Sequence, residues 1–413
     1  MKAVFDAGRL LKIFVLLLLL LVAEFVLPNY VSRFFMRVVA DVSALIDPSE
    51  SQPKHAVIPL DSVQANEFAF EFVPLSEYPI ERAAGVLGPD ANGAFQIVEQ
   101  THTAVAGRSF EPILTSLNAQ YPDGWKGGFK QLLEIGQAHF ALLGLVGPEC
   151  SFSVLIDVQR SEIVDKYPCI DETNGRVSMQ NLGGGYVVSG EGTLLMALGT
   201  GTDVTWAKAS AMAQDPASPY GKILRYDIVQ EADGPRLENR RVATSGHRNP
   251  QGMAMIGDVA LAVEHGPKGG DEINLIEEGA NYGWPLFSAG SQYNQGDISA
   301  FAPKASTYAN PIFTFVPSIA TSDISTCPSI IASRYEPADC AIVAGLISQS
   351  IFIVLGDFAS RQVWSVEVVE VGARIREVFV EGDDLYLVPD QAELTRVNIV
   401  AFPCDAYAGP CAE

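Results

Sequence analysis

Short apolar runs separated by Gly, Pro, Asp and Asn make up most of the chain beyond the first third. The runs are rich in β-branched and aromatic residues, which suit pleated strands. One segment, GGFKQLLEIGQ at 127–137, instead spaces its apolar residues as a short helix would. The clearest runs predict strands at 151–159, 184–190, 193–199, 221–228, 258–266, 271–276, 350–357, 361–369, 375–382 and 384–390. The pattern therefore predicts an all-β fold.

A strand–turn–strand unit recurs along the chain, at 185–199, at 252–266 and again at 379–399. Units of this kind fit a β-propeller, in which radial sheets of antiparallel strands surround an axis. A pair of β-sandwiches remains an alternative on this pattern alone. No mid-chain segment has the composition of a linker that would separate two domains.

The first 28 residues predict a membrane segment, since basic residues precede an apolar run that ends before Pro28. We favour an uncleaved signal anchor over a cleaved signal peptide, because the residues before Glu24 match a cleavage site poorly. Either way the rest of the chain would be extracytoplasmic, either periplasmic or extracellular, and secreted if the signal is cleaved. The predicted regions are the anchor helix at 1–28, a stalk or linker at 29–56, the propeller at 57–403 and a C-terminal tail at 404–413.

Composition adds two constraints. Asp and Glu outnumber Lys and Arg by 49 to 27, a formal charge of −22, which argues against nucleic-acid binding and suits a protein that holds divalent cations. All six cysteines follow the apolar segment, and an even number in an oxidising compartment predicts disulfides. Six buried thiols are the alternative. Pairing of neighbours would join Cys150 to Cys169, Cys327 to Cys340 and Cys404 to Cys411.

The densest polar stretch reads GHRNPQGMAM at 246–255 and EHGPKGGDEINLIEEGANYGWP at 264–285. In a propeller, both parts would follow strands and meet at one mouth, where binding sites form. The fork of donors on Arg248 suits a carboxylate, and Asn249 can both donate and accept. Gly266 and Pro267 could offer backbone carbonyls to calcium. The alternative is a purely structural set of turns, with Arg248 paired to Asp271 and His265 buried in the core.

The same stretch resembles the glucose/sorbosone dehydrogenase family, the soluble pyrroloquinoline quinone (PQQ)-dependent aldose dehydrogenases. Three shorter segments match in the same order: AQDPASPYGKILRYDI at 213–228, FVPSIATS at 315–322 and ARIREVFVEGDDLYLVPD at 373–390. The resemblance implies a six-bladed β-propeller with the quinone held at one end, and an oxidoreductase that takes an aldose sugar or similar alcohol as substrate. It also implies an electron acceptor, whose identity the sequence leaves open.

Carried over by position, the resemblance implies a set of site residues. Those expected at the cofactor are Arg248, Asn249, His265, Asp271, Arg374 and Arg376. Those expected at calcium ions are Gly266, Pro267, Glu272 and Tyr282.

The resemblance fails at the residues that would carry out the reaction. Asn181 stands where the family has its general-base histidine, and an amide cannot take a proton from a hydroxyl at neutral pH. Gly185, Thr200 and Phe358 occupy three further positions where the family has polar or charged residues. Three possibilities follow: an active enzyme with a base from elsewhere, such as His265 or His102, a protein that binds cofactor or sugar without turnover, or a membrane-tethered scaffold.

Overall fold

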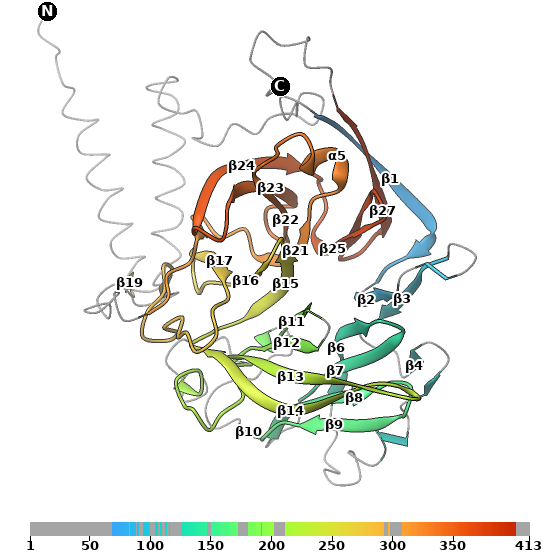
Figure 1. Cartoon of the computed structure of the whole chain (residues 1–413), viewed down its shortest axis with the longest axis vertical. Coiled ribbons are helices and arrows are strands. Elements are labelled where there is room, and N and C mark those ends of the chain that lie inside the picture. Colours follow the sequence, from blue (N-terminus) through green and yellow to red (C-terminus); the bar gives the residue numbers. More distant parts are fainter. Residues whose placement is uncertain are drawn as a thin grey trace, which may run out of the picture. The chain divides into compact units, whose positions relative to one another are not determined.

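The computed structural model shows an all-β ring of sheets (Figure 1). It describes residues 68–81, 83–87, 89–90, 94–99, 104–105, 108–109, 112–113, 115, 126–146, 150–171, 181–190, 192–201, 211–292, 296–297 and 308–401. The predicted anchor, stalk and tail lie outside these residues. Among the residues described, no helix is both long and apolar enough to cross a membrane.

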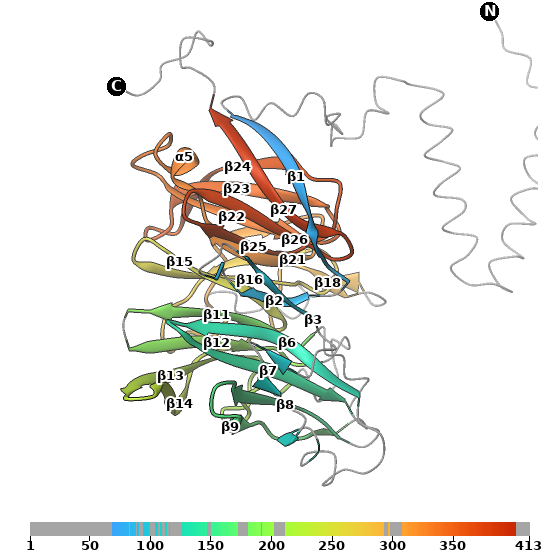
Figure 2. The same ribbon diagram turned by 90° about the vertical axis from the view of Figure 1, so that its right-hand side faces the viewer.

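Five antiparallel sheets of four or five strands follow one another around the ring (Figures 1 and 2). The first contains β6 (Lys126–Ile135), β7 (Ala138–Val146), β8 (Cys150–Asp157), β9 (Glu162–Lys166) and β10 (Ile170–Asp171). The second contains β11 (Gly183–Ser189), β12 (Thr193–Leu198), β13 (Lys222–Glu231) and β14 (Gly234–Ser245).

The third sheet contains β15 (Pro250–Ile256), β16 (Val259–Glu264), β17 (Asp271–Leu275) and β20 (Phe313–Phe315). The fourth contains β21 (Thr321–Thr326), β22 (Asp339–Gly345), β23 (Ser350–Asp357) and β24 (Gln362–Glu370). The fifth joins β25 (Ile375–Glu381), β26 (Asp384–Pro389) and β27 (Glu393–Ala401) to the first strand, β1 (Phe68–Pro79).

Three pairs of shorter strands complete the described elements, with the single helix α5 (Ser329–Ala332). The pairs are β2 (Ala83–Leu87) with β3 (Gln96–Glu99), β4 (Ala104–Val105) with β5 (Arg108–Ser109), and β18 (Ser291–Gln292) with β19 (Gly296–Asp297).

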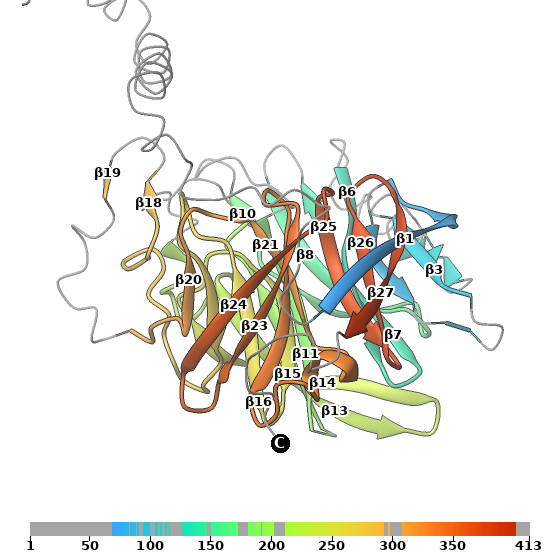
Figure 3. The same cartoon turned by 90° about the horizontal axis from the view of Figure 1, so that it is seen from above.

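Strand β1 closes the ring by pairing antiparallel with β27, in a register that runs from Phe68 opposite Ala401 to Leu75 opposite Leu394. The last sheet is therefore built from both ends of the described chain. Figure 3 shows β1 lying along β27 at this closure.

The hydrophobic core lies between neighbouring sheets. Separate clusters of buried side chains fill the spaces between successive sheets, and each strand inside a sheet therefore contributes apolar residues to two faces. The hairpin β2–β3 packs on the β6–β8 sheet through one cluster and on the β25–β27 sheet through another. The propeller prediction is confirmed as five sheets with this hairpin between the last and the first. A full sixth blade is not established by the described strands.

All ten predicted strands are present, but the predicted helix at 127–137 is wrong, because these residues form β6. The pairing of β6 with β7 shifts register between Phe129 and Gln131, and this bulge breaks the alternation of a regular strand. The buried residues Phe129, Leu132 and Leu133 therefore stand at positions i, i+3 and i+4, which is the spacing of a helix face.

One of the three predicted cysteine pairs is confirmed. Cys327 and Cys340 form the predicted disulfide, with Cα atoms 5.5 Å apart. Cys169 is also disulfide-bonded. The predicted pair of Cys404 and Cys411 lies outside the described residues.

The first strands of the sheets, β6, β11, β15, β21 and β25, line the axis of the ring, and two of them approach unusually closely there (Figure 1). A Cβ atom placed on Gly185 of β11 would lie 2.7 Å from the backbone carbon of Gly252 in β15. No side chain fits at 185 without movement of the backbone, which explains why this departure from the family pattern is a glycine.

Candidate active site

A cavity of about 710 Å³ lies at one end of the axis, where strand ends and loops of several sheets meet. Arg248 and Asn249 precede β15, His265 to Pro267 follow β16, and Arg374 precedes β25. The predicted site residues that line it are Asn181, Arg248, Asn249, His265, Gly266, Pro267, Arg374 and Arg376. Sequence segments more than 100 residues apart therefore converge on one hollow, as the motif predicted.

Arg248 is 5% exposed and is held from several sides. Its Nη1 donates to the carbonyl of His265 at 3.3 Å, and its guanidinium lies 5.5 Å from the centre of the Trp284 ring. The Glu264 carboxylate accepts from the backbone N–H of Arg248. The predicted ion pair of Arg248 with Asp271 is not among the described interactions. Arg248 is therefore fixed in place at the cavity wall by a carbonyl, an aromatic ring and the Glu264 carboxylate at its backbone N–H.

Glu264 is a site-forming residue that the sequence did not reveal. It is buried, and its Oε2 lies 2.8 Å from Nδ1 of His247, while Nε2 of His247 lies 2.8 Å from the Thr244 hydroxyl. The His247 ring also stacks on Tyr282 at 4.5 Å. These contacts fix the turn that presents Arg248. The only signal in the sequence was an acid directly before His265 and Gly266.

A chain of amides runs from the axis into the cavity. Lys130 Nζ donates to Gln251 Oε1 at 3.0 Å, and Gln251 Nε2 donates to Asn249 Oδ1 at 2.6 Å. Asn249 Nδ2 in turn donates to Asn181 Oδ1 at 3.3 Å. Asn249 is thus oriented by protein groups on both sides, and the carbonyl oxygen of Asn181 already accepts a hydrogen bond. Lys130 and Gln251 were not predicted from the sequence.

His265 is the one imidazole that lines the cavity in the described part of the chain. Its Nε2 is buried and has no hydrogen-bond partner. The pKa of His265 is lowered to about 4, chiefly by burial and also by the positive charge of Arg248, against the opposing effect of Asp271. The ring is therefore neutral at pH 7 and has an unsatisfied polar atom, which costs free energy unless a ligand meets it.

Asp271 has a structural position rather than a place on the cavity wall. Its side chain is fully buried and accepts from the backbone N–H of Gly266 at 3.0 Å, from the Ser318 hydroxyl at 2.6 Å and from the backbone N–H of Ala320 at 2.6 Å. The residue is absent from the described lining. Asp271 therefore ties the loop of Gly266 and Pro267 to the segment that enters β21.

Arg374 and Arg376 share one acid. Arg374 Nε donates to Asp390 at 3.2 Å, and Arg376 Nη2 donates to both carboxylate oxygens of Asp390 at 2.8 and 3.0 Å. Burial acts to raise the pKa of Asp390, but the two guanidinium groups outweigh it and the pKa is lowered overall. Two cations against one anion leave this side of the cavity with a net positive charge.

Glu272 and Tyr282, predicted near a second calcium ion, line a separate hollow of about 10 Å³ together with Glu264 and Trp284. The pKa of Glu272 is raised to about 8, chiefly by burial and next by the charge of the neighbouring Glu264. The described residues contain no group of three or more His, Cys, Asp or Glu side chains placed to hold a metal ion. A calcium ion here would therefore need backbone carbonyls or ligand oxygens.

The other departures from the family pattern lie away from the cavity wall. The Thr200 hydroxyl and backbone N–H both donate to the carbonyl of Arg248. Phe358 is fully buried in the core between two sheets. Arg361, the nearest cation to Phe358, pairs with Glu277 at 2.7 Å on the surface. None of these residues offers a polar group to the cavity.

Comparisons with known proteins agree with this geometry. The sequence profile of the glucose/sorbosone dehydrogenase family matches residues 156–396. The chain is 30% identical over 231 residues to the aldose sugar dehydrogenase YliI of Escherichia coli, covering 53% of this chain and 60% of that protein. It is 32% identical over 214 residues to an uncharacterised protein of Synechocystis, covering 48% and 51%. The chain thus spans about half the length of the curated relatives it matches.

Solved structures show the same fold. The apo form of the soluble aldose sugar dehydrogenase of Escherichia coli matches with a TM-score of 0.60 at 21% identity, over 80% of this chain and 99% of that one. The PQQ-bound aldose sugar dehydrogenase of Streptomyces coelicolor matches with a TM-score of 0.51 at 17% identity, over 80% and 99%. At these identities the likeness establishes the fold alone.

Proposed function

Because the chain belongs to the glucose/sorbosone dehydrogenase family, we propose that it binds PQQ in the cavity at Arg248 and is an oxidoreductase for an aldose sugar or a similar alcohol. A relative is named as an aldose sugar dehydrogenase, and a structural neighbour holds PQQ, which supports the class of cofactor and substrate. We further propose that the protein works outside the cytoplasm, tethered through its N-terminal segment, since the disulfide of Cys327 and Cys340 suits an oxidising compartment.

The observation that carries the proposal is the chemistry of the cavity wall. PQQ bears three carboxylates and two quinone oxygens, so its site must supply cations and hydrogen-bond donors. Arg248, Arg374 and Arg376 all line the cavity, and only one described carboxylate, Asp390, lines it beside them. The buried Nε2 of His265 also lacks a partner on this wall. The residues present therefore fit an anionic, planar ligand.

Calcium is the second proposed cofactor. The loop of Gly266 and Pro267 lines the cavity and would offer neutral carbonyl oxygens, while Glu272 and the Tyr282 carbonyl would serve a second ion. A bound calcium ion would supply Lewis acidity towards the quinone, which itself supplies the redox chemistry. The contribution of this chain is then to bind, orient and hold the ligand in the hollow.

The proton from the substrate hydroxyl has no strong acceptor on the described wall. Asn181 is an amide whose oxygen already accepts from Asn249, and the pKa of His265 is lowered to about 4. His102, the other proposed base, lies outside the described residues. We therefore propose turnover slower than that of a histidine-base enzyme, by the order of 10²–10⁴ that general bases contribute. The same observation favours a second candidate function, a membrane-tethered protein that binds the cofactor or a sugar without turnover.

The test is a calorimetric titration of the purified full-length chain with PQQ, with and without calcium, followed by dye reduction with a panel of aldoses. We expect calcium-dependent PQQ binding and slow reduction with at least one sugar. PQQ binding without reduction by any sugar would favour the second candidate. If the chain gave no heat with PQQ in the presence of calcium, both candidates that use the cofactor would be rejected.

A further inference from the structure

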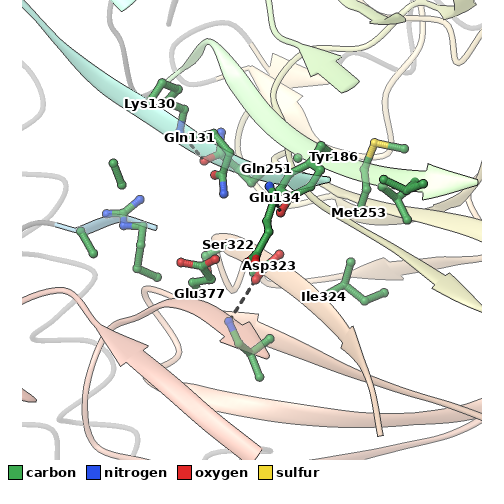
Figure 4. A pocket seen from close by; sticks show the side chains of 17 residues that line it. Lys130, Gln131, Glu134, Tyr186, Gln251, Met253, Ser322, Asp323, Ile324 and Glu377 are labelled. Atoms are coloured by element: carbon green, nitrogen blue, oxygen red, sulfur yellow. Dashed lines mark hydrogen bonds between the residues drawn. The ribbon is translucent and has the colours of Figure 1, made fainter. Parts of the chain in front are cut away.

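A second cavity of about 360 Å³ lies on the axis of the ring. It is lined by residues from the first strand of each of the five sheets and from β2, so the whole ring contributes to it (Figure 4). It shares only Gln251 and Arg376 with the first cavity. We call it the axial cavity and the cavity at Arg248 the mouth cavity. The two are neighbours along the axis with different linings.

A buried cation lies on one side of the axial cavity. Lys130 is 9% exposed, and its Nζ donates to the neutral amide oxygen of Gln251 at 3.0 Å. Its pKa is lowered to about 7 by burial and next by the positive charge of Arg376, and no carboxylate of the described residues opposes this. The amine is therefore held at a neutral partner, with no anion to balance its charge.

Two acids lie on the other side, where Asp323 of β21 and Glu377 of β25 occupy adjacent strands. Asp323 accepts from the backbone N–H of Val378 at 3.0 Å, whereas Glu377 makes no hydrogen bond or ion pair in the described part of the chain. Figure 4 shows both carboxyl groups facing the cavity, apart from Lys130. Burial raises the pKa of Glu377 to about 7, and burial followed by the charge of Glu377 raises the pKa of Asp323.

The cavity thus contains the buried Lys130 and the half-buried Asp323 and Glu377, which form no ion pair with one another. The two other charged residues that line it are Glu134, which is exposed, and Arg376, which is paired with Asp390. Buried charges are normally paired, because an unpaired one loses its hydration without compensation. Apolar side chains of Met253, Ile324 and Val378 line the same hollow. A ligand with an anion at one end, a cation at the other and a short apolar body between them would satisfy all three features.

We propose that the axial cavity is a second ligand site, for a small linear zwitterion whose carboxylate meets Lys130 and whose ammonium group meets Asp323 and Glu377. Amino acids with several methylenes between the two charged groups fit this description, because Lys130 and the acids lie on opposite sides of the hollow. The proposal does not depend on PQQ binding in the mouth cavity.

Other ligands fit less well. A neutral sugar would leave the cation and both acids without counter-charges. A metal ion would find Asp323 and Glu377, but no group of three or more His, Cys, Asp or Glu side chains among the described residues is placed to hold one, although Glu134 also lines the hollow. A purely anionic ligand would meet Lys130 but would be repelled by the acids.

The test is calorimetry of the purified full-length chain with 6-aminohexanoate as the probe, compared with hexanoate, hexylamine, glycine and glucose. We expect one molecule of 6-aminohexanoate to bind, and each single-charge analogue to bind at least about tenfold more weakly, since each loses one charge-assisted contact. No heat with 6-aminohexanoate, or hexanoate or glucose binding as tightly, would overturn the proposal.

Two variants test which residues meet the carboxylate and the ammonium group of the ligand. Glu377→Gln keeps the shape of the side chain and should weaken binding of 6-aminohexanoate at least about tenfold. Lys130→Met should weaken it by a similar factor. The control is Glu278→Gln, which changes an exposed acid and should leave the affinity unchanged. Hexylamine, which has only the ammonium group, distinguishes the loss of one charged contact from misfolding of the site. Its binding should be retained in Lys130→Met and lost in Glu377→Gln. Equal loss in both variants, or retention in both, would contradict the assignment. PQQ at saturation should leave the affinity for 6-aminohexanoate in place.

Discussion

The two cavities on the axis differ in how their charged side chains are held. In the mouth cavity, Arg374 and Arg376 are anchored on Asp390, and Arg248 is fixed by a carbonyl and an aromatic ring. In the axial cavity, Lys130 contacts only an amide, and Glu377 has no partner among the described side chains. The first arrangement is organised in advance, with positive charge in excess. The second leaves charges to be balanced by protons or by a ligand.

Removing Asp271 should have the largest effect, because its carboxylate holds the loops of the mouth cavity together. Asp271→Ala would leave the buried N–H groups of Gly266 and Ala320 without their acceptor, a loss of about 3 kcal/mol or more in the free energy of unfolding. Urea denaturation measures it. Asp258→Ala, at an exposed turn, is the control and should change stability by less than about 0.5 kcal/mol. A small loss for Asp271→Ala would mean that the mouth does not depend on this anchor.

The next largest effect concerns the arginine at the centre of the mouth cavity. Arg248→Ala should weaken PQQ binding by about 10- to 100-fold, since hydrogen bonds to charged groups contribute about 1.5–3 kcal/mol. The measurement is the calorimetric titration with calcium present. Arg361→Ala removes a surface arginine paired with Glu277 and should leave the affinity unchanged. If both variants lost PQQ affinity equally, binding would depend on the net charge of the protein and not on a specific site.

The axial cavity should make the free energy of unfolding depend on pH. The pKa of Glu377 is raised to about 7 from an ordinary value of 4.5, so the folded chain keeps a proton that the unfolded chain has released between these pH values. This group therefore makes the free energy of unfolding fall as pH rises from about 4.5 to 7, by on the order of 2 kcal/mol. Glu377→Gln should remove that part of the slope in denaturation curves measured across this range. An unchanged slope would show that Glu377 is not held in a low-dielectric space.

Restoring one family residue should have the smallest effect. Asn181→His alone should raise dye reduction by less than about tenfold, because Gly185 has no room for a side chain and Phe358 is in the core. A new imidazole would also have to replace the hydrogen bond that Asn181 accepts from Asn249. A gain of several hundredfold would show that the missing base is the only defect of the mouth cavity.

The fold was more predictable than the site. Strands such as β12 and β23 are buried on both faces, so they read as continuous apolar runs bounded by turns. The prediction at β6 was wrong for two reasons. Its bulge interrupts the strand alternation, and polar residues such as Lys130 face the axis, so the apolar positions that remain have helical spacing. Strands that surround a polar cavity do not alternate as strands over an apolar core do.

In the candidate site, the residues within the long motif were predicted together and do line one cavity, including Arg248, His265 and Pro267. Asp271 was assigned to the cofactor, yet its carboxylate is consumed by loop contacts. Lys130 and Gln251 escaped prediction because they meet across the ring from positions 121 residues apart, and Glu264 because its contact with His247 forms only when β16 pairs with β15. Such partners carry no local pattern, so only the folded arrangement can reveal them.

The seam between β1 and β27 has a consequence for how the protein is made. The earliest described strand needs a partner that lies at the far end of the chain, since Phe68 pairs with Ala401. During synthesis the hydrogen-bonding edge of β1 that faces β27 stays unpaired until all the other sheets have been made. Closure of the ring is thus a late event, and a chain cut short before β27 would leave that edge open to aggregation.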